Sequence, residues 1–478
     1  MVRKGLFFPI IVGTFLALPC LMIAGWTRIY GGEADDGGYC VSQTSDGGCI
    51  VSGYSYSLNS LWILKTDEYG DTLWTRDSVD WRVGIGYSVQ ETADGGWIVT
   101  GYVAPFRDGK HHLYLIKLDS EGQVLWTRGD WEWINEPVGG VGYSVRQTSD
   151  GGYIIAGATS PWFGEIEDLW LIKTDSAGDT LWTRIYGGEG PDCGCSVREA
   201  SDGGYIVAGY TSTDWSLWLL RTDENGDIVW TSGLEGWWYG KGYSVTETSD
   251  GGWIVTGYVE PFDDAKHHLI VARMDSDGDT LWTRMEQGWF PNGAGGVGRC
   301  IQKTSDGNFI LTGYTSEWIG DTNDLFLVKL NPAGDTLWTR IYGGDGEDVG
   351  YCVDQTADGG YIIAGETKSF GAGNYDLWLL RTDASGDTLG VIEELVVDVG
   401  SNWHVLSPIG SEIVLRYEDS PCGFHAFVFD AAGRKVDELH SDQSSGVINW
   451  GEGYSTGVYF IKVELDTSGS AQKVVLMK

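Results

Sequence analysis

Basic residues are scarce in this sequence. Lysine and arginine total 31 against 68 aspartates and glutamates, which gives a formal net charge of −37. Binding to nucleic acid or to an anionic lipid surface depends on neutralising phosphates with cations. The charge balance therefore argues against nucleic acid and anionic membranes as partners, and it indicates a protein that is soluble outside the cell.

Cysteine is present without the spacing of a disulfide framework or a zinc ribbon. Of the eight cysteines, Cys20 lies in the N-terminal apolar segment, and the remaining seven are odd in number. Cys40, Cys300 and Cys352 share one position of a repeat in which other copies mostly have serine. We interpret these three as small buried residues, and we expect neither a metal site nor a cofactor.

Long apolar runs are also absent beyond the N-terminus. Residues 1–25 begin with basic residues, continue with an apolar stretch and end with the small residues Ala24 and Gly25. This order is typical of a secretory signal peptide cleaved near Ala24. A retained anchor is the alternative, because the run approaches the length that spans a bilayer. We expect an exported protein with no stable membrane insertion after signal cleavage.

Glycine and tryptophan, by contrast, are abundant, with 72 and 24 residues. They belong to a repeat whose motif is [SA]-D-G-[GN]. Its copies are spaced by 48, 56 and 52 residues, and this order occurs twice, which gives a super-repeat of 156 residues. The seven copies have their aspartate at Asp46, Asp94, Asp150, Asp202, Asp250, Asp306 and Asp358.

Each copy has the pattern of four short strands separated by Asp-Gly or Gly-Asp turns. In the third copy we predict strands at Gly142–Thr148, Tyr153–Thr159, Asp168–Asp175 and Thr180–Tyr186. No stretch has helical periodicity. Four strands per unit, repeated seven times, predict an all-β fold with a seven-bladed β-propeller at residues 26–390.

The sequence WTRIYGGE at Trp26–Glu33 explains how the ring closes. Its W-T pair normally belongs to the fourth strand of a repeat. The seven copies of this pair begin at Trp26, Trp74, Trp126, Trp182, Trp230, Trp282 and Trp338. The seventh copy of the repeat ends at Gly390 without one. We therefore predict that the N-terminal strand completes the last blade and removes an exposed sheet edge.

The repeats resemble the SBBP-type seven-bladed β-propeller repeats of exported bacterial proteins. The segment WTRIYGGEGPDCGCSVREASDGGYIVAGYTS at Trp182–Ser212 carries this resemblance, which extends over residues 26–389. It implies the propeller fold and no single activity.

After Gly390 the period stops, and a linker at 391–402 precedes a second domain at 403–478. The motifs D-x-x-G-R-x-V, G-V-Y-F and K-x-V-x-x-K follow one another there, and this domain resembles the type A sorting domain of the type IX secretion system. The residues that carry these motifs are Asp430, Gly433, Arg434, Val436, Gly457, Val458, Tyr459, Phe460, Lys473 and Lys478.

The resemblance of this domain implies a small immunoglobulin-like β-sandwich that is recognised by the type IX machinery. It also implies delivery through the periplasm to the outer cell surface or the medium of a Gram-negative-type bacterium. An ordinary immunoglobulin-like appendage is the alternative.

No catalytic constellation interrupts the repeats. The turn D-x-x-G-D-x-L-W is interpreted as structural, because Asp and Gly set the hairpin while Trp packs between blades. The histidine pairs at 111–112 and 267–268 are 156 residues apart, in well-separated blades, so a shared metal is not expected. We predict no catalytic residues.

The long loops carry aromatic side chains beside acids and asparagines, a combination that suits sugar rings. The candidate ligand-binding residues are Trp81, Trp131, Trp133, Trp162, Trp237, Trp238, Trp289 and Trp318. Burial of these rings against the propeller edge and contact with a partner protein remain alternatives.

The sequence thus favours a non-catalytic binding scaffold, with glycans or a surface protein as ligand. The alternative is a secreted lyase or glycosidase whose site lies at the channel mouth. A polar cluster that breaks the sevenfold pattern at the channel would favour the enzyme, and a continuous aromatic groove would favour the binder.

Overall fold

The structure, a computed structural model, describes residues 25–388 and 403–476 with short gaps. The gaps are 57, 59, 78–83, 105–109, 131–138, 160–166, 213–215, 235–238, 262–265, 287–288, 291–293, 317–322 and 373, and then 408, 411–412, 418–423, 431–433, 442, 452, 456 and 464–471. The chain divides into two compact units, Met1–Gly390 and Val391–Lys478. Among the described residues, no helix is long and apolar enough to cross a membrane.

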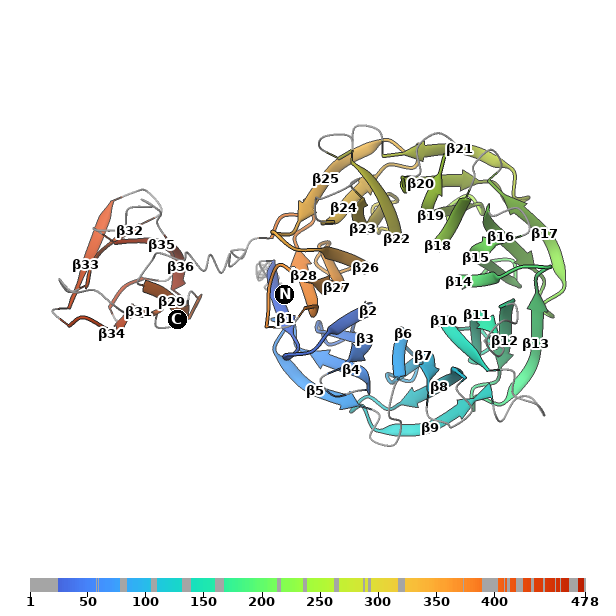
Figure 1. Ribbon diagram of the computed structural model, residues 1–478, viewed down its shortest axis with the longest axis horizontal. Helices are drawn as coiled ribbons and strands as arrows, with labels where there is room; N and C mark the ends of the chain where they lie inside the picture. The colour runs from blue at the N-terminus through green and yellow to red at the C-terminus, as the bar shows by residue number, and fades with distance from the viewer. Residues whose placement is uncertain are drawn as a thin grey trace, which may run out of the picture. The chain divides into compact units, whose positions relative to one another are not determined.

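Seven four-stranded antiparallel sheets form the first unit and surround a central channel (Figure 1). Their strands are β1 (Trp26–Tyr30), β2 (Asp36–Gln43), β3 (Cys49–Ser55), β4 (Ser60–Thr66), β5 (Thr72–Asp77), β6 (Gly84–Glu91), β7 (Trp97–Val103), β8 (His112–Leu118), β9 (Val124–Gly129), β10 (Gly140–Gln147), β11 (Tyr153–Thr159), β12 (Leu169–Thr174), β13 (Thr180–Tyr186), β14 (Asp192–Glu199), β15 (Tyr205–Thr211), β16 (Ser216–Thr222), β17 (Ile228–Gly233), β18 (Tyr239–Glu247), β19 (Trp253–Glu260), β20 (His268–Met274), β21 (Thr280–Met285), β22 (Gly295–Lys303), β23 (Phe309–Ser316), β24 (Leu325–Leu330), β25 (Thr336–Tyr342), β26 (Asp348–Gln355), β27 (Tyr361–Thr367) and β28 (Asp376–Thr382).

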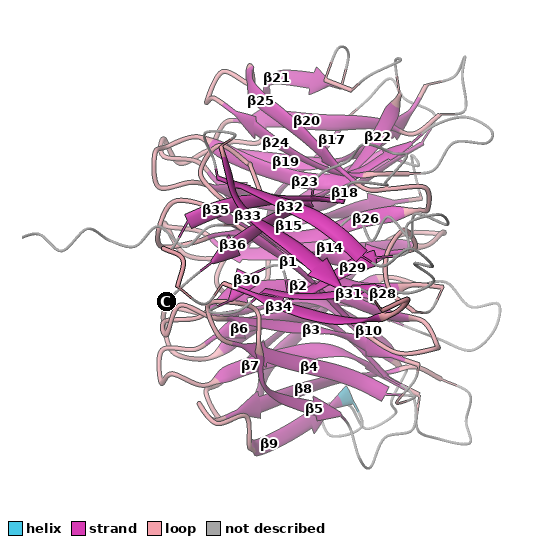
Figure 2. Cartoon of the chain, turned by 90° about the vertical axis from the view of Figure 1, so that its left-hand side faces the viewer, coloured by secondary structure: helices cyan, strands magenta, loops and turns pink. Residues whose placement is uncertain are grey.

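The burial of each strand follows its place in the blade. Every residue of β3 and of β4 is buried, because neighbouring blades cover both faces of these middle strands. The outer strand β5 has no buried residue. Figure 2 shows the sheets edge-on, with the connections between strands at both faces of the disc. The apolar cores therefore lie between blades, as expected for packed twisted sheets.

The predicted closure of the ring is confirmed. Strand β1 pairs antiparallel with β28, with Trp26 opposite Arg381 and Tyr30 opposite Leu377. Trp26 is 8% exposed, and its indole Nε1 donates a hydrogen bond of 2.9 Å to the carbonyl oxygen of Glu68 in the first blade. Strand β1 is thus built into the last blade, and its Trp26 contacts the first blade.

Each outer-strand tryptophan packs on a glycine turn of the following blade. The Trp26 ring lies against Gly70, and the Trp74 ring lies against Gly122. Both glycines have a φ near +80°, and a Cβ at either position would lie within 3.0 Å of the ring. The D-x-x-G-D turn therefore needs glycine both for its backbone conformation and for this contact.

A basic side chain on the third strand of every blade pairs with the aspartate of the [SA]-D-G-[GN] turn. In the second blade, Lys117 Nζ lies 3.0 Å from Asp94 Oδ1. The other pairs are Lys65–Asp46, Lys173–Asp150, Arg221–Asp202, Arg273–Asp250, Lys329–Asp306 and Arg381–Asp358. The repeated aspartate thus gives a largely buried cation its partner.

The second unit is a small β-sandwich of a three-stranded and a five-stranded sheet. Its strands are β29 (Trp403–Ser407), β30 (Ile409–Gly410), β31 (Ile413–Tyr417), β32 (Phe424–Asp430), β33 (Lys435–Ser441), β34 (Gly446–Trp450), β35 (Gly457–Val463) and β36 (Gln472–Leu476). Leu415 and Trp450 of one sheet share a buried core with Val428 and Ile461 of the other. This unit therefore has a core of its own.

Candidate functional site

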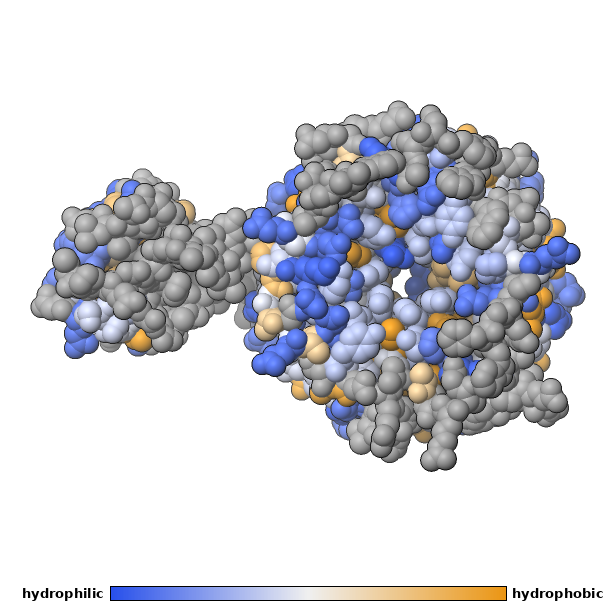
Figure 3. Space-filling view, in the orientation of Figure 1, coloured by the Kyte–Doolittle hydropathy of each residue, from blue (hydrophilic) through white to orange (hydrophobic). Residues whose placement is uncertain are grey.

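The innermost strands of the seven blades line the central channel, which is open at its centre in Figure 3. A cavity of about 370 Å³ occupies it. In every blade the first strand has an irregular register next to its glycine, such as that between Gly38 and Cys40 in β2. A bulge of this kind leaves one residue unpaired and turns it. Two consecutive residues of each strand, such as Tyr39 and Cys40, therefore line the same cavity.

The first ring around the cavity is aromatic in five of seven blades. Its members are Tyr39, Tyr87, Tyr143, Cys195, Tyr243, Arg299 and Tyr351. The ring of Tyr39 lies 4.7 Å from that of Tyr351 and 5.0 Å from that of Tyr87, which lies 5.0 Å from that of Tyr143, between ring centroids. These four tyrosines form a continuous aromatic arc. Burial raises the pKa of each phenol above its ordinary value, so the hydroxyls are neutral donors and acceptors.

The arginine in this ring interrupts the sevenfold pattern. The Arg299 guanidinium lies 4.2 Å from the ring centroid of Tyr243 and 5.4 Å from that of Tyr351. Its Nε is buried and has no hydrogen-bond partner among the described residues. A buried donor without a partner is costly, so the position is suited to an acceptor supplied by a ligand.

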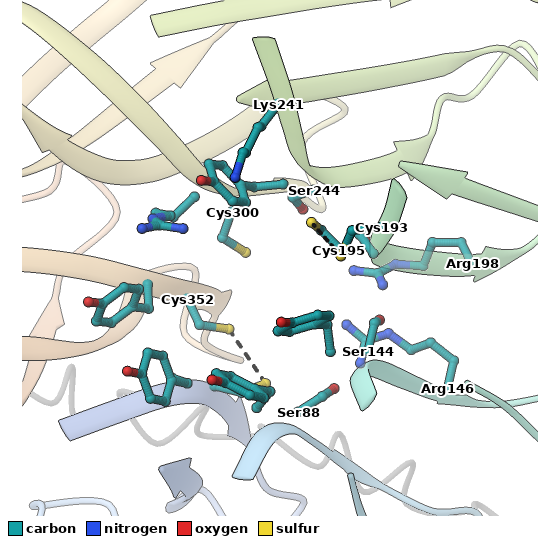
Figure 4. Close-up of a pocket in the computed structure, with 18 of the residues that line it drawn as sticks. Ser88, Ser144, Arg146, Cys193, Cys195, Arg198, Lys241, Ser244, Cys300 and Cys352 are labelled. Atoms are coloured by element: carbon teal, nitrogen blue, oxygen red, sulfur yellow. Dashed lines mark hydrogen bonds between the residues drawn. The ribbon is translucent and has the colours of Figure 1, made fainter. Parts of the chain in front are cut away.

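The second break opens the ring two blades away, on the other side of the blade that carries Tyr243. At Cys195 the small side chain leaves room beside Tyr210 and Lys241, which also line the cavity. Lys241 Nζ lies 4.1 Å from the Tyr210 ring centroid. Cys195 Sγ lies 3.9 Å from Cys193 Sγ, and Figure 4 shows this pair beside the cavity.

A second ring of serines and cysteines joins each blade to the next. Val197 N donates to Ser144 Oγ at 3.2 Å, and Ile301 N donates to Ser244 Oγ at 3.2 Å. Cysteines make the equivalent contact, since Cys300 Sγ donates to the carbonyl oxygen of Val353 at 3.7 Å. The remaining contacts are Ser88–Val145, Ser196–Val245, Cys352–Val41 and Cys40–Val89. The three cysteines are small buried residues, as the sequence predicted.

A third ring places two arginines side by side. Arg146 of β10 and Arg198 of β14 point their guanidinium groups into the channel (Figure 4). Each donates a 2.9 Å hydrogen bond to a carbonyl of its own strand, at Val145 and Val197. Burial and the neighbouring charge of Arg146 lower the pKa of Arg198 to about 9. Neither arginine forms an ion pair within the described part of the chain.

Carboxylates near the channel already accept hydrogen bonds from the protein. Asp354 Oδ2 accepts from Gln43 N at 2.9 Å, and Glu366 Oε1 accepts from the Tyr351 hydroxyl at 2.6 Å. Burial raises the pKa of both carboxyls. Across the residues that the structure describes, no group of three or more His, Cys, Asp or Glu could hold a metal ion.

Seven of the eight candidate loop tryptophans lie outside the described residues. They are Trp81, Trp131, Trp133, Trp162, Trp237, Trp238 and Trp318. The eighth, Trp289, is half-buried and packs against the core formed by residues such as Leu269 and Phe326. The aromatic loop surface stays a prediction.

The histidine pairs have structural partners away from the channel. His112 Nδ1 lies 3.0 Å from Asp130 Oδ1 and both side chains are buried, while the His111 ring lies 4.1 Å from that of Tyr102, between centroids. His268 and Glu286 repeat the first contact in the fifth blade. The two pairs thus occupy equivalent positions in two blades.

The motif residues of the C-terminal unit meet in its five-stranded sheet. Asp430 at the end of β32 pairs with Tyr459 of β35, and Phe460 pairs with Lys473 of β36. Gly457 and Val458 also lie in β35, Val436 lies in β33, and Arg434 is exposed just before it. Gly433 and Lys478 lie outside the described residues.

The channel residues were not among the sequence-predicted site residues. The signal was present, because Arg299 stands where five other blades have tyrosine, and Arg146 and Arg198 stand where the remaining blades have Ser, Gln, Thr or Asp. Such departures from a repeat become meaningful only when the strand that carries them is known to face the channel.

No family model and no curated protein matches this chain. Solved structures match its fold. A crystal structure of puromycin hydrolase is 13% identical with a TM-score of 0.50, covering 90% of this chain and 59% of that one. The Neurospora crassa Pan2 WD40 domain (9% identity, TM-score 0.44) covers 74% of this chain and 97% of its own. Sqt1 from Chaetomium thermophilum (10% identity, TM-score 0.45) covers 75% of this chain and 100% of its own. At these identities the likeness concerns the fold alone, which is a β-propeller with the seven blades described above.

Proposed function

We propose that this protein is an exported, non-catalytic binding propeller whose ligand, a glycan, enters the tyrosine-lined channel. The observation that carries the proposal is the continuous arc from Tyr351 through Tyr39 and Tyr87 to Tyr143 around an open cavity. Tyrosine offers a sugar both an apolar face and a hydroxyl for hydrogen bonding. The nearby carboxylates of Asp354 and Glu366 are engaged by protein donors, which favours binding over acid–base chemistry.

A glycan array probed with the full chain tests this proposal, followed by titration of the best glycan. Tyr87→Ala and Tyr143→Ala are expected to weaken binding at least about fivefold, as removal of an aromatic contact worth about 1 kcal/mol implies. Tyr69→Ala, at an exposed turn on the rim, is the control and should bind like the wild type. Undiminished binding by both channel variants would move the site elsewhere, for example to the predicted loop tryptophans.

An enzyme remains the second candidate because a polar cluster containing Arg299, Lys241 and Cys195 does break the sevenfold pattern at the channel. Incubation of the protein with acidic and neutral polysaccharides, followed by measurement of new reducing ends, separates the two functions. The binding proposal expects none. Turnover that disappears in Arg299→Gln would instead establish a lyase or glycosidase.

We further propose that the C-terminal unit directs export through the type IX machinery. Its support is the order of the motifs and their position in one sheet of an independently packed sandwich. Deleting Val391–Lys478 should leave a folded propeller in the periplasm of a host with this machinery. Grafting the same segment onto an unrelated periplasmic reporter should carry the reporter to the surface or medium. Surface delivery of the truncated propeller would reject the proposal.

A further inference from the structure

The charge of the channel is opposite to that of the whole molecule. The chain has a net charge of −37, yet the residues lining the central cavity include four cations and no carboxylate, and the adjoining cavity that shares Arg146 and Arg198 has one carboxylate, Asp354. The cations are Arg146, Arg198, Lys241 and Arg299. Within the described part of the chain, none of the four forms an ion pair.

These half-buried cations are unlike the buried basic residues of the protein. On the third strand of every blade, a lysine or arginine meets the turn aspartate, as Lys117 meets Asp94 at 3.0 Å. Buried charges are normally paired in this way. Among the described residues the four channel cations lack so close a partner: Asp354 acts on Arg146, and Glu366 on Arg299, only at longer range. The cations therefore outnumber the carboxylates at the channel, which leaves room for an anionic group.

Hydrogen-bond donors at two places in the channel are available to an anion. Arg146 lies close enough to Arg198 for its charge to lower the pKa of Arg198. Each guanidinium donates one 2.9 Å hydrogen bond to a carbonyl of its own strand, and its other N–H groups can donate to a ligand. Arg299 has a buried Nε without an acceptor. An oxyanion accepts paired hydrogen bonds from guanidinium groups, and it would relieve the repulsion between the two arginines.

We infer that the channel binds a sugar carrying an oxyanion group, such as a carboxylate or a phosphate. This inference rests on the proposed function for the sugar ring, which contacts the tyrosine arc. The arginines select for a ligand that carries a negatively charged group. The strongly negative outer surface repels such ligands in general, so the specificity comes from the cationic channel itself.

Calorimetric titration of the full chain with glucuronate, glucose 6-phosphate, glucose and inorganic phosphate tests the inference. Either or both of the charged sugars should bind at least about tenfold more tightly than glucose, because hydrogen bonds to a charged group contribute more than hydrogen bonds between neutral groups. Their binding should also exceed that of inorganic phosphate, and the preferred sugar shows whether carboxylate or phosphate is selected.

Arg146→Gln, Arg198→Gln and Arg299→Gln should each weaken binding of the charged sugar by about tenfold or more, while glucose binding changes little. Arg76→Gln is the matched control, because Arg76 lies on the outer strand over Trp74. If an inner variant does not fold, the shift in melting temperature of the wild type with glucuronate, glucose 6-phosphate and glucose decides the question.

Equal affinity for glucose and for the charged sugars, with the tyrosine variants impaired, would overturn this inference and leave the proposed function standing. Inorganic phosphate binding as tightly as the charged sugars would overturn the sugar part and leave a bare anion site. Absence of all binding would overturn both. Binding that survives in all three arginine variants would also reject the inference.

Discussion

Serine and cysteine occupy equivalent positions in the middle ring of the channel because each contacts the main chain of the next blade. Cys352 Sγ donates to the carbonyl oxygen of Val41 at 3.5 Å across the junction between the last and first blades. We expect Cys352→Ser to leave the free energy of unfolding within about 1 kcal/mol of the wild type, and Cys352→Val to lower it by about 1–3 kcal/mol through loss of the donor.

Urea unfolding of the two variants measures this difference, and Ser196→Cys, the reverse exchange at another blade, is the control and should be nearly neutral. Equal stability of Cys352→Ser and Cys352→Val would show that only the volume of the side chain matters at this ring.

The turn aspartates make the stability of the fold depend on pH. Although partial burial acts to raise it, hydrogen bonds from Thr92 and Lys117 hold the pKa of Asp94 at about 2, against about 3.9 in an unfolded chain. Asp150 is equivalent, with a pKa of about 2. A depressed carboxyl pKa stabilises the fold above about pH 4, and this contribution is lost as the pH falls through about 2.

We therefore expect the melting temperature to fall progressively between about pH 5 and pH 2. Asp94→Asn should lower the melting temperature at neutral pH and make its decline in acid shallower. Asp277→Asn, at an exposed turn of the fifth blade, removes a carboxylate without breaking such a pair and should keep the wild-type slope. Parallel melting curves for Asp94→Asn and the wild type would show that the pair contributes nothing.

At the scale of the element, two glycine turns of the second blade separate backbone strain from packing. Gly95 and Gly122 have φ values of +78° and +76°. A Cβ at Gly95 would meet nothing within 4 Å, whereas a Cβ at Gly122 would lie 2.7 Å from the Trp74 ring. Both alanine variants carry a similar backbone cost of about 1 kcal/mol, and only Gly122→Ala also displaces the tryptophan.

Chemical denaturation should therefore show Gly122→Ala to be less stable than Gly95→Ala by about 1–3 kcal/mol, the usual cost of overpacking. The Trp74→Ala background is the control, in which the two glycine variants should have the same effect. Similar losses in the wild-type background would mean that the Trp74 contact adjusts without cost.

The strands were predictable because their pattern is local. In the third blade, the predicted strands at Tyr153–Thr159 and Thr180–Tyr186 have the observed bounds, and the other two differ at their ends by one or two residues. Alternation and turn chemistry decide these features within a few residues. The bulge beside Gly142 had no such signal, and it is the bulge that brings both Tyr143 and Ser144 to the cavity.

At the scale of the whole molecule, the cationic channel could not be predicted from the overall composition. A net charge of −37 averages over the surface, while Arg146, Arg198 and Arg299 come from three different blades and line one cavity because the first strands of the blades surround the channel. Ring closure itself was readable, since the count of W-T pairs matched the count of turn motifs with an offset of one blade. Repetition therefore revealed the architecture, and departures from repetition mark the site once that architecture is known.

The stability of the propeller is expected to depend on closure of the ring by β1. Deleting residues 26–32 removes β1, exposes the edge of β28 and empties the Trp26 position. We expect a loss of stability above the roughly 3–5 kcal/mol typical of one buried aromatic, together with aggregation through the exposed edge. Denaturation and light scattering measure both effects.

The matched control moves the same segment instead of removing it. Placing residues 26–32 directly after Leu389 recreates the order G-D-T-L-W-T-R found in blades such as the third and the sixth. The relocated strand should pair with β28 through an ordinary turn within the blade. We expect this rearranged chain to recover most of the lost stability and not to aggregate, because the last blade is again four-stranded. A deletion variant that melts like the wild type, or a relocated strand that restores nothing, would contradict the closure seen in the structure.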